Sequence, residues 1–157
     1  MDITTTRFGT MTANPQDILL FERGLIGFEQ CKRWLLLADA QNDTLGWLQS
    51  VDNAQIAMAI VSPRRFVPDY QLRIQRSQLD DLRIDSPEKA EVVVLVSRHP
   101  EGLCLNLKAP LVIQIDLKAG CQVISSQDHP VRHLLTEPAV PKMAVSEIST
   151  CEQKKIA

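Results

Sequence analysis

Along much of this chain, apolar and polar residues alternate with a period of two, the spacing of side chains on one face of a β-strand. The clearest run covers residues 111–117, where Leu111, Ile113 and Ile115 would share one face. Residues 70–75 and 103–107 alternate in the same way. Each of these three segments is therefore predicted to be a strand with one buried face.

Two other segments, residues 55–61 and 92–96, are apolar at nearly every position. Such continuous runs are typical of strands that are covered on both faces. We expect both to be central strands and the hardest part of the sheet to perturb.

Turn residues separate these runs. Gly24, Gly27, Pro63, Pro68 and Gly120 fall where strands should end. Helical signals are short: one or two turns could begin at Ser77 or at Ser86 followed by Pro87, and a third helix is predicted over residues 131–135 after Asp128 and Pro130. Many strands, closely spaced turns and little helix indicate an antiparallel barrel or sandwich.

Pro110 stands directly before the alternating run of residues 111–117. Proline lacks the N–H that a strand ladder needs, so it is tolerated at the first residue of a strand or at a bulge. Residues 108–110 are therefore predicted to form a kink that turns a barrel corner. Pro110 is either a connection that the fold requires or a contact site.

Length and charge limit the classes of function. The 157 residues fit one domain, and the net charge of −2 comes without a dense basic run. A surface built for nucleic acid needs basic residues that neutralise phosphates, so direct nucleic-acid binding is not expected. The N-terminal residues lack a signal peptide, and no apolar stretch approaches the length of a membrane span, so we expect a cytoplasmic protein without a membrane partner.

The cysteines predict no disulfide framework. Cys31, Cys104, Cys121 and Cys151 form no closely spaced pair, and a reducing compartment disfavours disulfides. Cys104 and Cys121 lie in strand-like sequence and are predicted to be small buried hydrophobic residues.

Few residues suggest chemistry. His129 and His133 have the spacing of paired metal ligands on a helix, but no third ligand is evident, so a solvated helix face is favoured and no metal is expected. The chain also has no phosphate-binding loop, nucleophile elbow or dinucleotide motif. We therefore expect no catalytic residue, no cofactor and no small-molecule substrate. A small hydrolase or isomerase would require Asp52, Asp69 and His99 to converge in a pocket.

Residues that are costly to expose are the candidates for recognition. Phe66 and Tyr70 flank Pro68 and Asp69 in one short turn, in a chain that is only 4% aromatic. Aromatic residues are enriched at binding hot spots, although both could instead anchor the turn to the core. The same reasoning places Trp34 and Trp47 in the core.

Polar residues inside apolar strands have two possible roles. Gln49 and Asn106 either satisfy backbone groups or face a partner, and the sequence does not separate these alternatives. Asp52 and Asp69 stand beside strand ends, where carboxylates commonly stabilise turns.

Four segments resemble the flagellar assembly factor family, FliW: GLIGFE at residues 24–29, LQSVD at 48–52, FVPDY at 66–70 and NLKAPLVIQ at 106–114. The resemblance extends from Ile3 to about Leu135. It divides the chain into a FliW-like β-barrel domain, residues 1–136, and a C-terminal segment, residues 137–157. Because that segment is rich in proline, serine and charged residues, we expect a flexible tail.

The resemblance implies a compact antiparallel β-barrel-like fold, all-β with a few short helices, and a non-enzymatic function. Members of the family bind the translational repressor CsrA and relieve its repression of flagellin synthesis, and flagellin in turn sequesters them. This chain differs from many members at residues 56–58, which contain no aromatic side chain, and at Gln114. The candidate partner-binding residues are Gln49, Asp52, Phe66, Pro68, Asp69, Tyr70, Asn106 and Pro110.

A β-barrel could also be an oligonucleotide-binding module. Such modules combine a basic groove with exposed aromatic side chains on which bases stack. The negative net charge and the low aromatic content of this chain argue against that alternative.

Overall fold

The structure of the protein is a computed structural model that describes residues 1–80, 82, 89–135 and 153–155. The chain forms the strands β1 (Asp2–Thr5), β2 (Gly9–Thr12), β3 (Ile18–Leu20), β4 (Arg33–Asp39), β5 (Leu45–Ser50), β6 (Ala57–Val61), β7 (Ala90–His99), β8 (Gly102–Leu105), β9 (Leu111–Gln114), β10 (Ala119–Gln122), β11 (His133–Leu135) and β12 (Gln153–Lys155). Three short 3-10 helices lie in the described residues: η1 (Pro15–Asp17), η2 (Pro63–Arg65) and η3 (Arg76–Leu79). The prediction of an all-β, barrel-like fold with a few short helices is confirmed.

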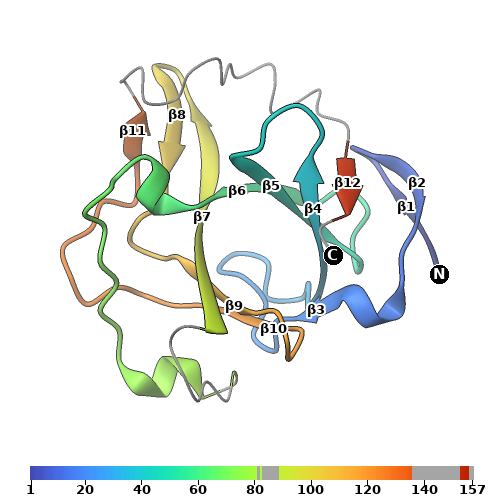
Figure 1. The fold of residues 1–157 in the computed structure, drawn as a ribbon, viewed down its shortest axis with the longest axis horizontal. Helices are drawn as coiled ribbons and strands as arrows, with labels where there is room; N and C mark the ends of the chain where they lie inside the picture. The colour runs from blue at the N-terminus through green and yellow to red at the C-terminus, as the bar shows by residue number, and fades with distance from the viewer. Residues whose placement is uncertain (81, 83–88, 136–152, 156–157) are drawn as a thin grey trace.

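The strands close into a barrel (Figure 1). β3, β4, β5, β6 and β7 pair in sequence order, and β9 and β10 complete the ring by pairing with β7 and β3. The long strand β7 takes part twice, since its first half pairs with β9 and its second half with β8. β8 and β11 thus extend the sheet away from the barrel, and β1 and β2 form a separate hairpin.

One parallel pairing is needed to close this ring. The seven barrel strands alternate in direction at every pairing except β3 with β10, which is parallel. Strict alternation cannot close a ring with an odd number of strands, so one neighbouring pair must run the same way. The fold is therefore antiparallel apart from the single register pair Leu20 and Ala119.

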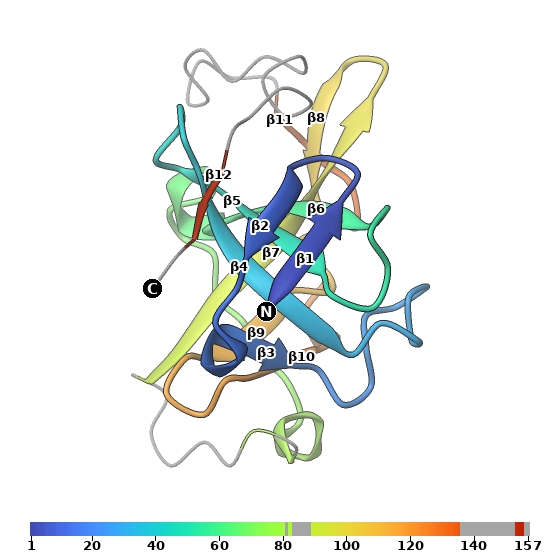
Figure 2. The ribbon, with the colours of Figure 1, turned by 90° about the vertical axis from the view of Figure 1, so that its right-hand side faces the viewer.

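Alternation along the strands separates two apolar cores. The inward rows surround Trp34, Phe21 and Leu111 inside the barrel, and the outward rows of β4 to β6 gather around Trp47. The hairpin of β1 and β2 covers this outer core on the right-hand side of Figure 1 and faces the viewer in Figure 2. Trp34 and Trp47 are both fully buried, as the sequence predicts.

The two continuous apolar runs behave differently. β6 is central, with Ile60 buried on its inward face and Val61 on its outward face, so the prediction for that strand is confirmed. In β7 only Val94 is fully buried, while Val93 and Leu95 on the inward row are half-buried. The interior of the barrel is thus less completely covered beside β7.

Two predicted strands are wrong, one in part and one entirely. The run of residues 111–117 is a strand only as far as Gln114, because the chain then turns and Lys118, with φ of 51°, donates its N–H to Ile115 O. All four residues of β9 are buried, so this strand has no exposed face. Residues 71–75 belong to no strand, although their burial alternates as predicted.

Two turn and helix predictions also need correction. Residues 131–135 form no helix but include β11, which pairs with β8. Gly120 lies inside β10 rather than at a strand end. Glycine is needed there because the Cβ of any other residue would collide with the Phe21 ring. The short helix predicted to begin at Ser77 is present as η3, which begins one residue earlier at Arg76, whereas Ser86 and Pro87 lie outside the described residues.

The three cysteines that can be described are all buried. Cys31, Cys104 and Cys121 are buried thiols, which confirms the prediction for Cys104 and Cys121, while Cys151 lies outside the described residues. Most of the predicted tail, residues 137–157, also lies outside them, apart from β12, which pairs antiparallel with β4.

Candidate binding surface

Side-chain hydrogen bonds connect three of the four motifs of the sequence: GLIGFE, FVPDY and NLKAPLVIQ. The loop formed by residues 106–110, here called the central loop, receives two of these links. Tyr70 donates its hydroxyl to Leu107 O at 2.8 Å, and Gln122 donates its side-chain amide to Ala109 O at 3.0 Å. The same Gln122 accepts the N–H of Ile26 at 2.7 Å. The central loop is therefore held between the FVPDY and GLIGFE motifs.

The central loop is itself folded by its own side chains. Asn106 is half-buried, and its Oδ1 accepts the N–H of Ala109 at 3.1 Å. Pro110 is buried immediately before β9, and its carbonyl accepts the N–H of Val123 at 3.0 Å. The predicted corner at residues 108–110 is confirmed, and both candidate residues contribute to forming it.

Tyr70 anchors the FVPDY turn to the core. Its side chain is buried and its ring lies on that of His129, with centroids 4.7 Å apart. Burial raises the pKa of the Tyr70 hydroxyl to about 12. The alternative that Tyr70 anchors its turn, rather than faces a partner, is the one that agrees with this position.

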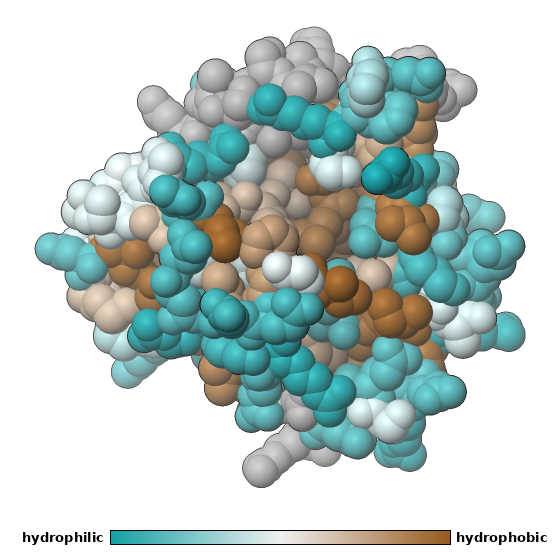
Figure 3. All heavy atoms as spheres, turned by 180° about the vertical axis from the view of Figure 1, so that it is seen from behind, coloured by the Kyte–Doolittle hydropathy of each residue, from teal (hydrophilic) through white to brown (hydrophobic). Residues whose placement is uncertain are grey.

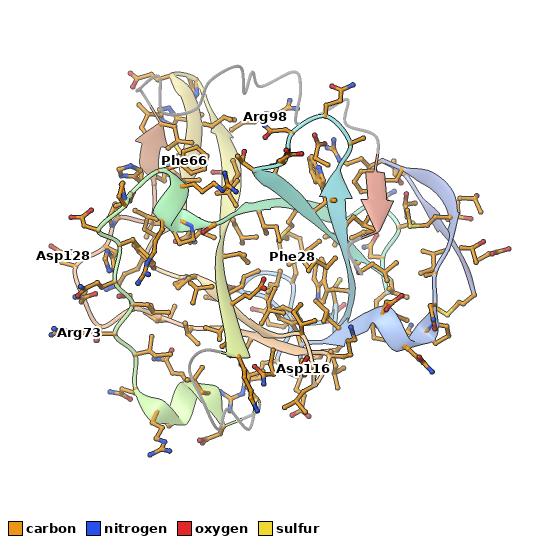
Figure 4. The ribbon with its side chains drawn as sticks, viewed as in Figure 1. Phe28, Phe66, Arg73, Arg98, Asp116 and Asp128 are labelled. Atoms are coloured by element: carbon orange, nitrogen blue, oxygen red, sulfur yellow. The ribbon has the colours of Figure 1, made fainter. Side chains whose placement is uncertain are left out.

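The rest of the FVPDY turn remains accessible. Pro68 and Asp69 are exposed, and Phe66 is half-buried against the outer core. Arg64 fixes the turn by donating its Nε to Tyr70 O at 3.1 Å. Figure 4 shows Phe66 on the same side of the molecule as Arg73 and Asp128. We call residues 66–69 the exposed turn.

Gln49 supports the backbone rather than facing outward. Its side chain is completely buried, and its Nε2 donates to Ser50 O at 2.9 Å and to Ile56 O at 3.1 Å. These bonds close the turn between β5 and β6. Of the two roles that the sequence left open, the structure therefore favours the satisfaction of backbone groups for Gln49.

Asp52 ties the same turn to the start of β4. Its carboxylate accepts the N–H groups of Lys32 and Arg33 at 2.8 and 2.9 Å and forms an ion pair with the Arg33 guanidinium at 2.7 Å. Partial burial alone would raise the pKa of Asp52, but the hydrogen bonds from Arg33 and Lys32 outweigh it and lower this pKa. The turn role proposed for Asp52 agrees with these contacts.

The GLIGFE loop closes the back end of the barrel (Figure 2). Gly24 and Gly27 adopt φ of 66° and 87°, values that favour glycine. Gly27 donates its N–H to the Glu29 carboxylate at 3.0 Å, and this bond lowers the pKa of Glu29. Leu25 is buried in the barrel, so the loop is anchored at its centre.

Two apolar residues of this loop remain accessible. Ile26 is 61% exposed and Phe28 is 38% exposed. Figure 3, which views the molecule from the back, shows hydrophobic atoms gathered across the middle of this face. The GLIGFE loop is therefore a second apolar feature that a partner could cover, at the opposite end of the barrel from the β4–β5 turn.

The structure does not assemble a catalytic site from the candidate residues. Asp52 is engaged with Arg33, Asp69 stands on the exposed turn, and His99 ends β7 with its Nδ1 accepting the N–H of Glu101. A cavity of about 350 Å³ lies beside Tyr70 and Leu72, and none of these three residues lines it. The convergence that a hydrolase would need is absent from the described residues.

The proposed histidine pair also has a different setting. His133 lies in β11 and not on a helix, while the Nε2 of His129 lies 2.9 Å from Gln71 O. Within the described part of the chain, no group of three or more His, Cys, Asp and Glu side chains could hold a metal ion.

Comparison with known proteins decides the family. The family model described as FliW protein matches residues 2–135. The flagellar assembly factor FliW of Syntrophus aciditrophicus is 37% identical over 136 residues, which cover 85% of this chain and 86% of the relative. The FliW of Caldanaerobacter subterraneus is 32% identical over 146 residues, 91% of this chain and 95% of the relative. The chain belongs to the FliW family.

A solved structure supports the same assignment. The crystal structure of a flagellar assembly factor FliW superimposes with a TM-score of 0.80 at 26% identity, and covers 87% of this chain and 98% of that chain. The barrel described above is therefore the FliW fold. No helix in the described residues is long and apolar enough to span a membrane.

Sequence reasoning missed three residues that organise this FliW surface. Gln122 bridges two motifs, the His129 ring packs at a tilt against Tyr70, and Arg33 pairs with Asp52. Each acts on a residue that is distant along the chain. Only Gln122 carried a detectable signal, as a polar residue between the apolar positions Cys121 and Val123.

Proposed function

We propose that this protein is a non-enzymatic regulator of flagellar assembly that acts by binding other proteins. The observation that carries the proposal is the FliW family match over residues 2–135, which includes nearly every described residue. The relatives with that match carry the name flagellar assembly factor. The lack of a converged catalytic group in the described residues agrees with a binding function.

The partners we propose are those that the family resemblance implies. The first is the translational repressor CsrA, whose repression of flagellin synthesis the protein would relieve. The second is flagellin, which would sequester the protein until it is exported. A net charge of −2 suits an encounter with a basic RNA-binding protein, because complementary charge speeds association. Both partners place the protein in the cytoplasm.

We propose that the exposed turn contributes to partner contact. Phe66 offers a half-buried aromatic side chain next to the exposed Pro68 and Asp69, and Tyr70 and Arg64 hold the turn in place. A preorganised turn loses little conformational freedom on binding, which favours affinity. Among the other candidate residues, Tyr70 would support this surface from beneath through its bond to Leu107 O, in the central loop that Asn106 and Pro110 shape. Gln49 and Asp52 stabilise the β5–β6 turn, at the other end of β6, and would hold the barrel that carries the surface.

Calorimetric titration of the purified protein against CsrA and against flagellin tests this proposal. The double variant Phe66→Ala with Asp69→Ala removes an aromatic and an acidic side chain from the exposed turn. The matched control, Phe28→Ala with Glu22→Ala, removes the same side-chain types from the loop at the back of the barrel. We expect the first variant to bind at least roughly tenfold more weakly, the loss typical of one hot-spot residue, and the control to bind normally.

The outcomes separate the parts of the proposal. Failure of the unaltered protein to bind either partner would overturn the regulatory function. If the Phe66 and Asp69 variant binds normally and the control binds more weakly, the partner contacts the GLIGFE loop and not the exposed turn.

A further inference from the structure

The two ends of the barrel differ. The GLIGFE loop buries Leu25 at the back end, whereas the opposite end holds a cavity of about 350 Å³ that we call the barrel mouth. The β4–β5 turn, the start of β7 and the β9–β10 turn surround it, and they lie together on the left of Figure 2. The view in Figure 4 looks toward this end, with Asp116 labelled on the β9–β10 turn.

Apolar side chains line the barrel mouth. They belong to the inward rows of the strands and continue the core inside the barrel: Leu36, Ala38, Ile60, Val93 and Ile115. Leu36, Val93 and Ile115 are only half-buried, which is unusual for residues that face the inside of a barrel. Covering them with an apolar group would remove this surface from water and stabilise the complex.

The space is also shaped by a glycine. Gly46 lines the barrel mouth on β5, where even a methyl group would lie 3.2 Å from the Ile60 side chain. A larger residue at this position would narrow the cavity. A volume of about 350 Å³ is enough for one or two aliphatic side chains, at the lower end of the range for small ligand sites.

The charged residues of the lining are both acidic. Glu91 continues the inward row of β7 beyond Val93, and Asp43 lies across the cavity on the β4–β5 turn. Both are exposed, and within the described residues neither forms an ion pair. Lys89 and Lys118 are close in sequence but do not line the cavity.

Taken together, an apolar cavity with an acidic rim favours an aliphatic group that has positive charge beside it. We propose that the barrel mouth binds a partner segment in which an aliphatic side chain enters the cavity and adjacent lysine or arginine residues meet Asp43 and Glu91. Carboxylates at the rim would repel phosphate groups, so the occupant is a basic protein segment and not nucleic acid. This surface shares no residue with the exposed turn and goes beyond the function proposed above.

A peptide titration followed by amide chemical shifts tests the inference without any flagellar partner. The full chain is titrated with the blocked peptide Ala-Lys-Leu-Lys-Ala and, separately, with Ala-Glu-Leu-Glu-Ala. We expect the lysine peptide to shift the amides of Ala38, Gly46, Val93 and Ile115. The glutamate peptide should bind roughly tenfold more weakly, because two exposed attractions become repulsions.

Two variants separate the contributions of charge and of the cavity. The double variant Asp43→Lys with Glu91→Lys should bind the glutamate peptide more tightly than the lysine peptide. The control, Glu101→Lys with Asp128→Lys, makes the same change in net charge away from the barrel mouth and should still prefer the lysine peptide. Val93→Phe fills the cavity and should weaken both peptides while the other amide shifts stay in place.

Three results would overturn the proposal. The first is an absence of shifts at the barrel mouth up to the solubility limit of the lysine peptide. The second is an equal loss of preference in both charge variants, which would mean long-range attraction only. The third is a single-stranded oligonucleotide that shifts the same amides more strongly than the lysine peptide does.

Discussion

At the scale of single residues, Asp52 is the candidate side chain whose hydrogen bonds carry a full charge. It accepts two backbone N–H groups at the start of β4 and the Arg33 guanidinium. Asp52→Asn removes the charge and turns an amide N–H₂ group toward these donors. We expect the free energy of unfolding at neutral pH to fall by about 1.5–3 kcal/mol, as for hydrogen bonds to a charged group.

The effect of Asp52→Asn should depend on pH. Because the pKa of Asp52 is lowered in the folded protein, its stabilisation is present above the unfolded pKa of about 3.9 and is lost as pH falls through the folded value. In urea unfolding, the free energies of Asp52→Asn and of the unaltered protein should differ by a large amount at neutral pH and by a small amount at about pH 3. Asp43→Asn is the control, because Asp43 is exposed and forms no ion pair with any described residue. If Asp52→Asn gave equal differences at both pH values, the prediction would be contradicted.

Tyr70 provides a second measurement at this scale, since it is the only tyrosine in the chain. Burial raises its pKa to about 12, so tyrosinate absorbance should appear near pH 12 in the folded protein and near the ordinary value of about 10 in urea. Because the raised pKa favours the neutral Tyr70 hydroxyl in the folded protein, this group contributes a stability that is fully present below about pH 10. That contribution is lost as pH rises through the folded pKa. Ultraviolet titration checks this directly, and an unshifted midpoint would mean that Tyr70 is not buried.

The burial of single residues was only partly predictable from the sequence. Trp34 and Trp47 are large and lie in apolar runs, and both are in the core as expected. Gln49 and Tyr70 could not be assigned, because their partners are backbone oxygens of other segments. A polar group tolerates burial when such a partner is present, and local sequence does not reveal one.

At the scale of elements, replacing each of the two glycines of the GLIGFE loop by alanine should lower the free energy of unfolding by different amounts. Both have positive φ, but a Cβ on Gly24 would lie 2.7 Å from Phe28 O and from Glu29 Cα, whereas a Cβ on Gly27 meets nothing within 4 Å. Gly27→Ala should therefore cost only the left-handed backbone penalty, about 1–2 kcal/mol. Gly24→Ala should cost about 3 kcal/mol or more, because backbone atoms must also move.

Chemical denaturation of the two glycine variants gives both values. If the costs were equal, the collision at Gly24 would be relieved by a loop movement. The amide shifts of Ile26 and Gln122, which are hydrogen-bonded to each other, would report that movement.

The errors in predicted elements have a common physical cause. Residues 71–75 have the alternating burial of a strand but pair with no strand among the described residues. The side chains of Leu72 and Ile74 instead pack on a third apolar cluster, formed by Leu82, Val112, Cys121 and Val123. Residues 133–135 become a strand because the edge of β8 is available for pairing. Hydrophobic periodicity and helix-capping residues are properties of one segment of sequence. The hydrogen bonds of a strand depend on which other segment lies beside it in the fold.

At the scale of the whole molecule, barrel closure joins segments that are far apart in sequence. β3 meets β10, and β7 meets β9, so the ring is complete only when residues from about 18 to 122 are in place. The sequence predicted a barrel or a sandwich, and the FliW resemblance favoured the barrel. Strand order and the parallel pair could not be derived from the pattern, because alternation specifies a face and not a neighbour.

The division of the chain near residue 136 leads to a prediction about the complete fold. A protein of residues 1–136 loses β12, whose three residues pair with β4 at residues 37–39. Backbone ordering costs about 1–2 kcal/mol per residue, and each hydrogen bond returns about 0.5–1.5 kcal/mol, so the two contributions nearly cancel.

We therefore expect the shortened protein to unfold cooperatively, with a free energy of unfolding within about 2 kcal/mol of the full chain. The informative control removes residues 1–13 instead. That deletion takes away Ile3 and Ala13, which are buried in the outer core beside Leu35 and Trp47, and it should abolish cooperative unfolding. Thermal and urea unfolding of the two shortened proteins show whether each of them unfolds cooperatively. Loss of cooperativity in the protein of residues 1–136 would mean that the C-terminal segment belongs to the domain, because pairing along the edge of β4 would then be needed to complete the sheet.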